Sequence, residues 1–464
     1  MQTRALSRKT LLCYSAGSIV ETSIYGFCGL YLMNFYTDVV HLDPRLIGYA
    51  FSIRFIIDAF SDPMVGFLSD RTRSRFGRRR PFLLLGVIPA SVLFYLLLKP
   101  PTGSELEVFV YLTIVSSLLI TSLTVFGIPY LALSWELTSN YNDRTRISGY
   151  RRVMEVVAEM LATLTIPGMM AIVAASSTAA NAETPADEST FYPTAAVFMG
   201  VASVAAAVTT FLGTKEHDPV GQNESEGFLS SALATYRNRP FVILLVTVTL
   251  VTVADRVATS MLLYLLEYFH GIPKQDAVPI FLAYFLGSLV SPVLWMMLSR
   301  RLGKKWTYIL ALVCWGTVIA SIAAVTWTAS MLYIMAGLMG AASSGVLLLP
   351  GAIEPDVIEW EQVRTGQRRE GMYAGVANFS WKISTAACFL LVGHLLHAIG
   401  YDGEVRPTLP VLNGLRLIFA ILPGVLIAAA ILVFRKFPIT PQSHNEIVKK
   451  IEQQDREAPE MDAS

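Results

Sequence analysis

The chain has 464 residues, of which 53% are hydrophobic and 15% are charged, and its formal net charge is +1 at pH 7. Soluble domains carry about a quarter charged residues, so this balance excludes an ordinary soluble protein and indicates a membrane protein. The near-zero net charge gives no sign of nucleic-acid binding. The four cysteines lie in apolar stretches, without the spacing of a disulfide framework or a metal site.

Twelve apolar segments are long enough to cross a bilayer as helices, because a hydrocarbon core about 30 Å thick needs about 20 helical residues. The first has no small-residue cleavage site, so we expect it to be retained rather than removed as a signal peptide. In chain order the segments are 11–37, 44–69, 80–99, 107–134, 149–174, 192–213, 240–268, 276–298, 306–326, 330–351, 373–399 and 411–434.

The basic residues predict which way the chain is inserted. Twelve spans place both termini on one side of the membrane. The loops that follow odd-numbered spans lie on the side opposite the termini, and of the 36 Lys and Arg residues few lie near them: Arg45, Lys99, Lys274, Arg406 and Arg416. Most of the others lie in the termini and in the loops that follow even-numbered spans. The positive-inside rule therefore predicts cytoplasmic termini in the cell membrane, whether a plasma membrane or a bacterial inner membrane.

A basic turn recurs halfway along the chain. "SRFGRRRPF" after the second span is matched by "SRRLGKKW" after the eighth, which aligns Gly77 with Gly303 at an offset of 226 residues. Such a match indicates internal repeats. We expect a six-helix half at 1–213, a cytoplasmic linker at 214–239, a second half at 240–436 and a cytoplasmic tail at 437–464.

The second span carries charge at membrane depth. Arg54, Asp58 and Asp62 follow one another at four-residue spacing and share one helix face. Asp58 lies about 18 Å from the basic end of its helix, at 1.5 Å per residue. Two carboxylates one turn apart repel each other unless a cation or proton lies between them. With Ser61 and Thr124 they predict a site for a hard cation such as Na⁺; a structural salt bridge from Arg54 or Lys382 is the alternative.

Charged residues in later spans extend this pattern. Glu159 and Lys382 each lie about 15 Å deep, near the midplane where secondary transporters bind their substrates. Arg152, Glu155 and Glu159 share one face of the fifth span. Asp255 and Arg256 in the seventh span are adjacent and point about 100° apart, so we expect each to find its partner on another helix.

Other classes of function fit the sequence less well. The six histidines are scattered, and no set of Ser, His or Cys residues has catalytic spacing, so we expect neither an enzyme nor a cofactor other than a coupling ion. A channel would be lined along its length and would not need acids concentrated in one half. A passive lipid scramblase stays open, and uptake independent of any cation gradient would favour it.

Several longer stretches resemble a known family. "YLMNFYTDVV" (31–40), "DAFSDPMVG" (58–66) and "DVIEWEQVRTGQRREGMYAGV" (356–376) are similar to the glycoside–pentoside–hexuronide cation symporters, typified by the melibiose permease, of the major facilitator superfamily. The resemblance implies an all-α membrane protein of twelve transmembrane helices in two pseudo-symmetric six-helix halves. It also implies coupling to Na⁺ or H⁺, a small organic solute as substrate, and a monomer in the bilayer.

The resemblance also assigns roles to residues. It implies a cation site at Asp58, Ser61, Asp62 and Thr124, and a substrate site that includes Lys382 and either Arg151 or Arg152. The sequence departs from the family at Thr22, Gly127 and Leu131, where two sugar-binding aspartates and a tryptophan are replaced. The candidate substrate-binding residues are Glu21, Thr22, Gly127, Leu131, Arg151, Arg152, Glu159 and Lys382, and the candidate conformational-switch residues are Asp70, Arg71, Arg75 and Arg78.

Two segments resemble a different substrate class within the superfamily. "LLLPGAIEPDVIEW" (347–360) and "YRRVMEVV" (150–157) are similar to the animal sodium-dependent lysophosphatidylcholine symporter. A lysolipid needs a basic anchor for its phosphate, which Lys382 and an arginine could supply, and an apolar slot for its chain. We therefore expect a sugar or glycoside as the substrate, with a lysophospholipid as the alternative.

Overall fold

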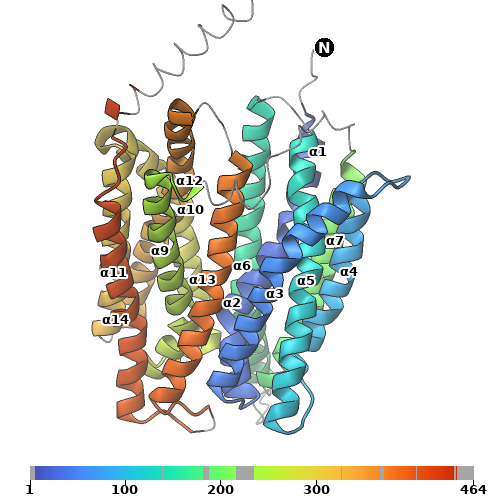
Figure 1. Cartoon of the computed structure of the whole chain (residues 1–464). Helices are drawn as coiled ribbons and strands as arrows, with labels where there is room; N and C mark the ends of the chain where they lie inside the picture. Colours follow the sequence, from blue (N-terminus) through green and yellow to red (C-terminus); the bar gives the residue numbers. More distant parts are fainter. Residues whose placement is uncertain are drawn as a thin grey trace, which may run out of the picture. The chain divides into compact units, whose positions relative to one another are not determined.

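The computed structural model describes residues 6–137, 141–180, 188–215, 235–325, 327–365, 370–403, 405–440, 442–443 and 446. All regular elements among these residues are helical (Figure 1). In chain order the α-helices are α1 (Arg8–Ala16), α2 (Ser18–Asn34), α3 (Pro44–Arg71), α4 (Arg80–Leu97), α5 (Glu105–Leu137), α6 (Tyr141–Ala180), α7 (Phe191–Gly213), α9 (Arg239–Tyr264), α10 (Val278–Leu302), α11 (Lys304–Ala324), α12 (Ala329–Thr365), α13 (Glu370–Ala398) and α14 (Leu409–Phe434). The shorter elements are the π-helical turns η1 (Phe35–Val39) and η3 (Leu265–Phe269) and the 3-10 turns η2 (Glu188–Thr190) and η4 (Lys274–Ala277).

The described residues form twelve membrane-length segments, because only Gly17 separates α1 from α2. Within this described part of the chain, ten helices are long and apolar enough to cross a bilayer by length and composition alone. The first segment is divided at Gly17 into helices of 9 and 17 residues, and α3 carries Arg54, Asp58 and Asp62. The predicted all-α fold with twelve transmembrane helices is confirmed.

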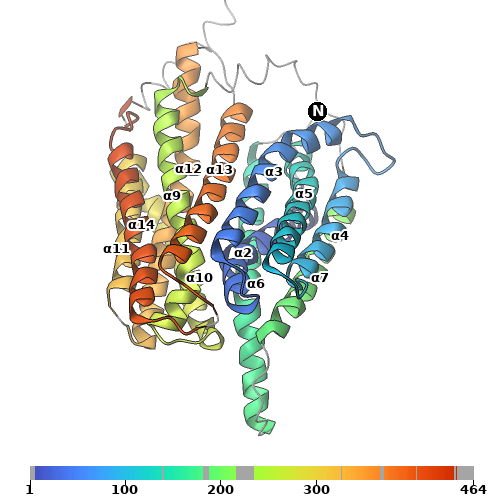
Figure 2. The ribbon, with the colours of Figure 1, turned by 60° about the horizontal axis from the view of Figure 1, so that its bottom comes forward.

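Prolines do not end the helices that contain them. α5 continues past Pro129, α6 past Pro167, and α12 past Pro350 to Thr365, whereas we expected the tenth span to end at 351. A membrane helix tolerates proline because neighbouring helices and local adjustments satisfy the backbone groups that it frees. α6 is 40 residues long, and Figure 2 shows one of its ends reaching past its neighbours in the same bundle.

Packing divides the chain into two compact units. Unit 1 comprises Met1–Gln222, Thr259–Val278 and Thr385–Leu415, and unit 2 comprises Asn223–Ala258, Pro279–Ser384 and Arg416–Ser464. In unit 1, α5 packs on α3 and α4, and α6 packs on α2; in unit 2, α11 packs on α12. The predicted domain boundaries follow the repeat instead and stay a prediction. Most of the predicted linker and tail lies outside the described residues.

The repeat is visible in the backbone where the first helix of each half ends. The π-helical turns η1 and η3 start 230 residues apart, at 35 and 265. Each is followed by a residue with positive φ, His41 (61°) in one half and Gly271 (67°) in the other. The next residue donates its backbone N–H across the turn, Leu42 to the Tyr36 carbonyl and Ile272 to the Leu266 carbonyl, both at 2.9 Å.

The two basic turns also match each other. Gly77 and Gly303 both have positive φ, at 105° and 80°. A basic side chain after each glycine binds a carbonyl near the end of the last helix of its half. Arg80 Nε donates to the Phe211 carbonyl at 3.0 Å, and Lys305 Nζ donates to the Phe437 carbonyl at 2.7 Å. Residues 211 and 437 again differ by 226, which confirms two pseudo-symmetric halves.

Replacing Gly303 by Ala is expected to destabilise the protein by about 1–3 kcal/mol, because its backbone (φ 80°, ψ 156°) lies in a region almost restricted to glycine. Thermal unfolding of the purified protein in detergent measures the change. Gly351→Ala is the matched control, since its φ is ordinary and nothing lies within 4 Å of an added Cβ. Equal melting temperatures for the two variants would contradict the expectation.

Candidate functional site

Asp58 on α3 and Thr124 on α5 form the centre of the candidate cation site in unit 1. Asp58 is fully buried, Thr124 is 4% exposed, and the Thr124 hydroxyl donates to Asp58 Oδ1 at 2.6 Å. Ser61 donates to the backbone carbonyl of Asp58 at 3.0 Å, and Asp62 is half-buried one turn further on. The oxygens of Asp58, Thr124 and Ser61 thus lie together inside the helix bundle of unit 1, with Asp62 one turn further on.

Arg54 lies on the same helix but its charge is directed to aromatic rings. The buried guanidinium lies 4.7 Å from the ring centroids of Phe51 and Phe55 and 5.9 Å from that of Phe389. The charge of Asp58 also acts on this guanidinium. A structural salt bridge from Arg54 or Lys382 to an aspartate therefore stays the alternative to a cation site.

Glu21 on α2 fills the space beside Gly127 on α5. A Cβ added at Gly127 would overlap the Glu21 carboxylate. The charges of Asp58, Glu21 and Asp62 all act on the Tyr25 hydroxyl, so these carboxylates gather around one side chain. The sequence departs from its family by lacking a carboxylate at 127, and the structure places the carboxylate of Glu21 there. In the described part of the chain, no three His, Cys, Asp or Glu side chains are close enough to hold a metal ion.

Replacing Gly127 by Ala is expected to displace the Glu21 carboxylate, which is the flexible end of its side chain, and to reduce solute uptake several-fold with little effect on stability. Uptake into proteoliposomes and thermal unfolding measure the two effects. Gly168→Ala on α6 is the control, because nothing lies within 4 Å of a Cβ there. Wild-type uptake by the Gly127 variant would exclude a role for the Glu21 position.

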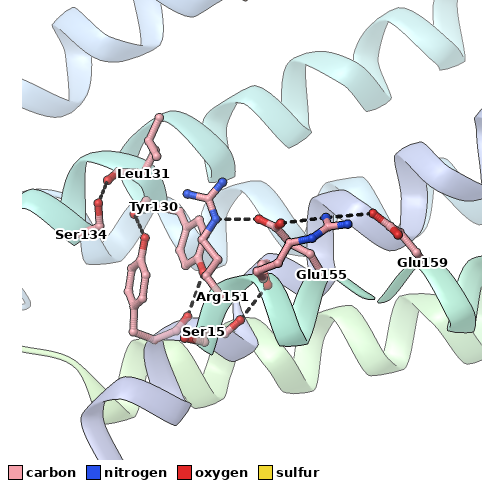
Figure 3. A network of polar contacts seen from close by, with 10 residues as sticks. Ser15, Tyr130, Leu131, Ser134, Arg151, Glu155 and Glu159 are labelled. Carbon is pink, nitrogen blue, oxygen red and sulfur yellow. Dashed lines mark hydrogen bonds and ion pairs between the residues drawn. The ribbon is translucent and has the colours of Figure 1, made fainter. Parts of the chain in front are cut away.

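The two candidate arginines of α6 share a network with its glutamates (Figure 3). Arg151 Nε lies 2.8 Å from Glu155 Oε1. Arg152 Nη1 lies 3.4 Å from Glu155 Oε2 and 3.3 Å from Glu159 Oε1. Glu155 therefore pairs with both arginines, and the two positive charges are matched by two negative ones. Figure 3 also shows Tyr130 and Leu131 beside the Arg151 side chain.

A pair of stacked tyrosines beside this network was not predicted. The rings of Tyr14 and Tyr130 lie 4.7 Å apart at 12°, and each hydroxyl donates to the backbone carbonyl of the other residue, at 3.1 and 3.0 Å. Both side chains are buried. They could not stack on a solute without moving, so they brace α1 against α5. Leu131, the neighbour of Tyr130, is 38% exposed.

Unit 2 contains a separate small cavity of about 80 Å³, which is lined by α9, α12 and α13. Its polar lining includes Glu354, Thr249 and Thr252, and its aromatic lining includes Trp381. Lys382, the next residue, is buried. The cavity thus combines a carboxylate with an aromatic face, the pairing that seemed to be missing from the sequence. Two features could have identified it, a glutamate inside a span and a tryptophan beside the buried lysine.

Asp255 and Arg256, neighbours on α9, contact each other. Arg256 Nε lies 3.9 Å from Asp255 Oδ2, at the outer limit of an ion pair, so the expectation that these neighbours do not pair was wrong. The Arg256 guanidinium also has a contact on another helix, since it lies 5.8 Å from the centroid of the Trp381 ring on α13. Of the candidate switch residues, Arg71 and Arg75 lie over the rings of Phe67 and Phe76, at 3.8 and 4.6 Å. Of the other two candidate switch residues, Arg78 is half-buried, and the side chain of Asp70 lies outside the described side chains.

Thr22, a candidate substrate-binding residue, is half-buried on α2.

Asp38, at the end of the first span, also joins segments that are distant in sequence. Its carboxylate accepts hydrogen bonds from Thr37 Oγ1 and the Tyr401 hydroxyl, both at 2.7 Å, and from Asn34 Nδ2 at 2.5 Å. Burial, together with the nearby Tyr264 and Asp38, raises the pKa of Tyr401 far above its usual range, so the hydroxyl remains a donor. Asp38 is therefore held by unit 1 as a structural acceptor.

The chain is similar to known transporters. The family described as MFS/sugar transport protein matches residues 13–441. A glucuronide carrier protein homolog of Escherichia coli (strain K12) is 24% identical, over 97% of this chain and 98% of its own. A sodium-dependent lysophosphatidylcholine symporter of Danio rerio is 24% identical, over 99% of this chain and 91% of its own. The crystal structure of the nucleoside transporter NupG has a TM-score of 0.63 at 14% identity, over 92% of this chain and 99% of that one, which shows the fold alone.

Proposed function

The chain belongs to the MFS/sugar transport protein family, and from that premise we propose that it is a cation-coupled symporter that carries a sugar or glycoside by alternating access. It is an integral membrane protein, and the relatives described above are named as a glucuronide carrier protein homolog and a sodium-dependent lysophosphatidylcholine symporter. The proposal places it in the cell membrane as a monomer with cytoplasmic termini. It needs Na⁺ or H⁺ as the coupling ion, has no catalytic activity, and keeps the basic turn at Asp70, Arg71, Arg75 and Arg78 as the part that changes contacts between states.

The buried Asp58 carboxylate supports the coupling step. Asp58 has a hydroxyl donor in Thr124, and Asp62 lies one turn away on the same helix. Their mutual repulsion, together with Glu21 nearby, favours binding of a cation or a proton. Binding would relieve the repulsion and favour the state that accepts solute, and release on the other side would reset the protein.

The Arg–Glu network of α6 is the observation that favours one substrate class over the other. Arg151 and Arg152 are already matched by Glu155 and Glu159, so a phosphate would have to displace a carboxylate before it could bind either arginine. A neutral polyhydroxylated solute can instead donate to the glutamates and accept from the arginines while both pairs stay in place. This charge balance favours a sugar or glycoside.

A lysophospholipid is the second candidate. Leu131, Val153 and Val157 are 38%, 56% and 48% exposed near the arginines, and such side chains suit an acyl chain. The sodium-dependent lysophosphatidylcholine symporter of Danio rerio, which is similar over nearly the whole chain, gives this candidate further support.

Binding of a fluorescent lysophosphatidylcholine to the purified protein, with and without Na⁺ and competed by a panel of glycosides, separates the candidates. We expect one glycoside to displace the probe, or the probe not to bind. Na⁺-enhanced binding that no glycoside displaces would transfer the assignment to lysophospholipids. Uptake into proteoliposomes that needs no Na⁺ or H⁺ gradient would reject coupled symport altogether.

A further inference from the structure

A second cavity in unit 2 lies at the basic turn around Gly303, apart from the candidate cation and substrate sites. It measures about 280 Å³. Its walls come from the end of α10, the Gly303 turn, the start of α11, α12, and the segment that follows α14. The described residues that line it are Ser299, Arg300, Gly303, Lys304, Lys305, Ile353, Asp356, Phe437, Ile439 and Thr440.

The charges of this cavity do not balance. Lys304 Nζ binds both oxygens of Asp356, at 2.6 and 2.8 Å, and the Ala352 carbonyl at 2.8 Å. This contact joins α11 to α12 and neutralises the one carboxylate among the lining residues. Among the described residues, Lys305 Nζ donates to the neutral Phe437 carbonyl and lies 6.0 Å from the centroid of the Trp306 ring, neither of which carries a negative charge. Arg300 is exposed. Two positive charges therefore remain.

A third positive charge lies close by. Arg435 is exposed just after α14, two residues before the Phe437 carbonyl that Lys305 binds, and its charge acts unfavourably on the ammonium of Lys305. Like charges held at short range are destabilising unless an anion lies between them. Phosphate is the anion that lysine and arginine bind most readily, through charge-assisted hydrogen bonds to its oxygens. The hydroxyl of Ser299 adds a possible donor at the edge of the cavity.

The surroundings indicate that the phosphate belongs to a lipid. Ile353, Phe437 and Ile439 line the cavity with apolar atoms, and Trp306 next to Lys305 is 57% exposed. An exposed tryptophan at a helix end is typical of the membrane interface. Leu302 and Leu310 are also exposed on the neighbouring turns of α10 and α11. A soluble anion would need none of these apolar surfaces, whereas a phospholipid would cover them.

We propose that this cavity binds the headgroup phosphate of an anionic phospholipid, in the leaflet on the side of the basic turns. Arg300 and Lys305 hold the phosphate, and the lipid links α10 and α11 to the segment after α14. Basic pockets between transmembrane helices are a recurrent place for such headgroups. The site is independent of the proposed transport function.

The test measures thermal unfolding of the full-length protein in nanodiscs of phosphatidylcholine with increasing fractions of phosphatidylglycerol. We expect phosphatidylglycerol to raise the melting temperature of the wild type. In Arg300→Gln/Lys305→Gln, the phosphatidylglycerol fraction needed for half the effect should rise roughly tenfold, as for loss of a charge-assisted hydrogen bond. Arg73→Gln/Arg75→Gln is the control, because both side chains are exposed and the change also removes two positive charges, from the equivalent turn of the first half.

The outcomes are distinct. An equal response of the Arg300/Lys305 variant and the wild type would overturn the proposal, and so would an equal loss of response in the Arg73/Arg75 variant. Stabilisation by inorganic phosphate equal to that by phosphatidylglycerol would show a site for soluble phosphate instead. If the Arg300/Lys305 variant does not fold, Arg300→Gln alone is measured, since Arg300 is exposed and makes no described contact that the fold needs. If the Arg300→Gln variant responded to phosphatidylglycerol as the wild type does, that result would also overturn the proposal.

Discussion

Replacing Asp58 by Asn is expected to abolish cation-dependent uptake into proteoliposomes while leaving the protein folded. Asparagine keeps the shape of the side chain and can still accept the hydrogen bond that Thr124 donates at 2.6 Å. It lacks the charge that a cation or proton would neutralise, so the gradient can no longer drive the binding step. We expect the stimulation of uptake by a Na⁺ or H⁺ gradient to fall about tenfold or more.

Two further variants separate this role from a general loss of charge. Asp276→Asn removes an exposed carboxylate from η4, and we expect it to retain wild-type stimulation. Thr124→Val keeps the volume but removes the donor to Asp58. It should weaken the apparent cation affinity by about tenfold, because a hydrogen bond to a charged group contributes about 1.5–3 kcal/mol. Unchanged gradient-driven uptake by the Asp58 variant would remove Asp58 from the coupling step.

The sequence was sufficient for the parts of the site that follow from helical geometry. Counting residues along a helix places Asp58 deep in its span, and the equal depth of Thr124 follows from the same count. The hydrogen bond between them agrees with that prediction. The basic turns were also predictable, because Gly77 and Gly303 stand at matching positions and both need positive φ. Short-range rules decide these features.

Other features depend on which faces of distant helices meet, and no single-helix rule supplies that. The sequence shows only that residue 127 lacks a side chain, and the structure shows that Glu21 uses the vacated space. The stacking of Tyr14 on Tyr130 joins residues 116 positions apart. Pro350 suggested that the tenth span ends at 351, but α12 continues to Thr365. In a membrane protein, packing against neighbouring helices compensates for the backbone hydrogen bond that a proline removes. The arrangement of the candidate substrate-binding residues thus depends mostly on contacts between helices, which the sequence of one helix does not reveal.

Replacing Glu155 by Gln tests the substrate class directly. Glu155 pairs with Arg151 at 2.8 Å and with Arg152 at 3.4 Å, so its loss as an anion leaves one glutamate for two guanidinium groups. If the solute is a sugar or glycoside, the arginines lose their fixed orientation and the acceptor for solute hydroxyls becomes neutral. Glycoside uptake should then fall several-fold, with a larger effect on the apparent KM than on gradient stimulation.

The lysophospholipid alternative predicts the opposite sign. With Glu155 neutral, a phosphate no longer competes with that carboxylate, and binding of fluorescent lysophosphatidylcholine should become tighter than in the wild type. Glu159→Gln is the matched control, because Glu159 contacts only Arg152 among the two arginines, at 3.3 Å, and should cause a smaller change in the same direction. The proposed coupling at Asp58 is the same for both classes of solute, so a Glu155 variant that loses glycoside uptake but keeps its stimulation by a cation gradient would locate the defect in solute recognition. A variant that gains lysolipid affinity would instead assign the arginines of α6 to a phosphate.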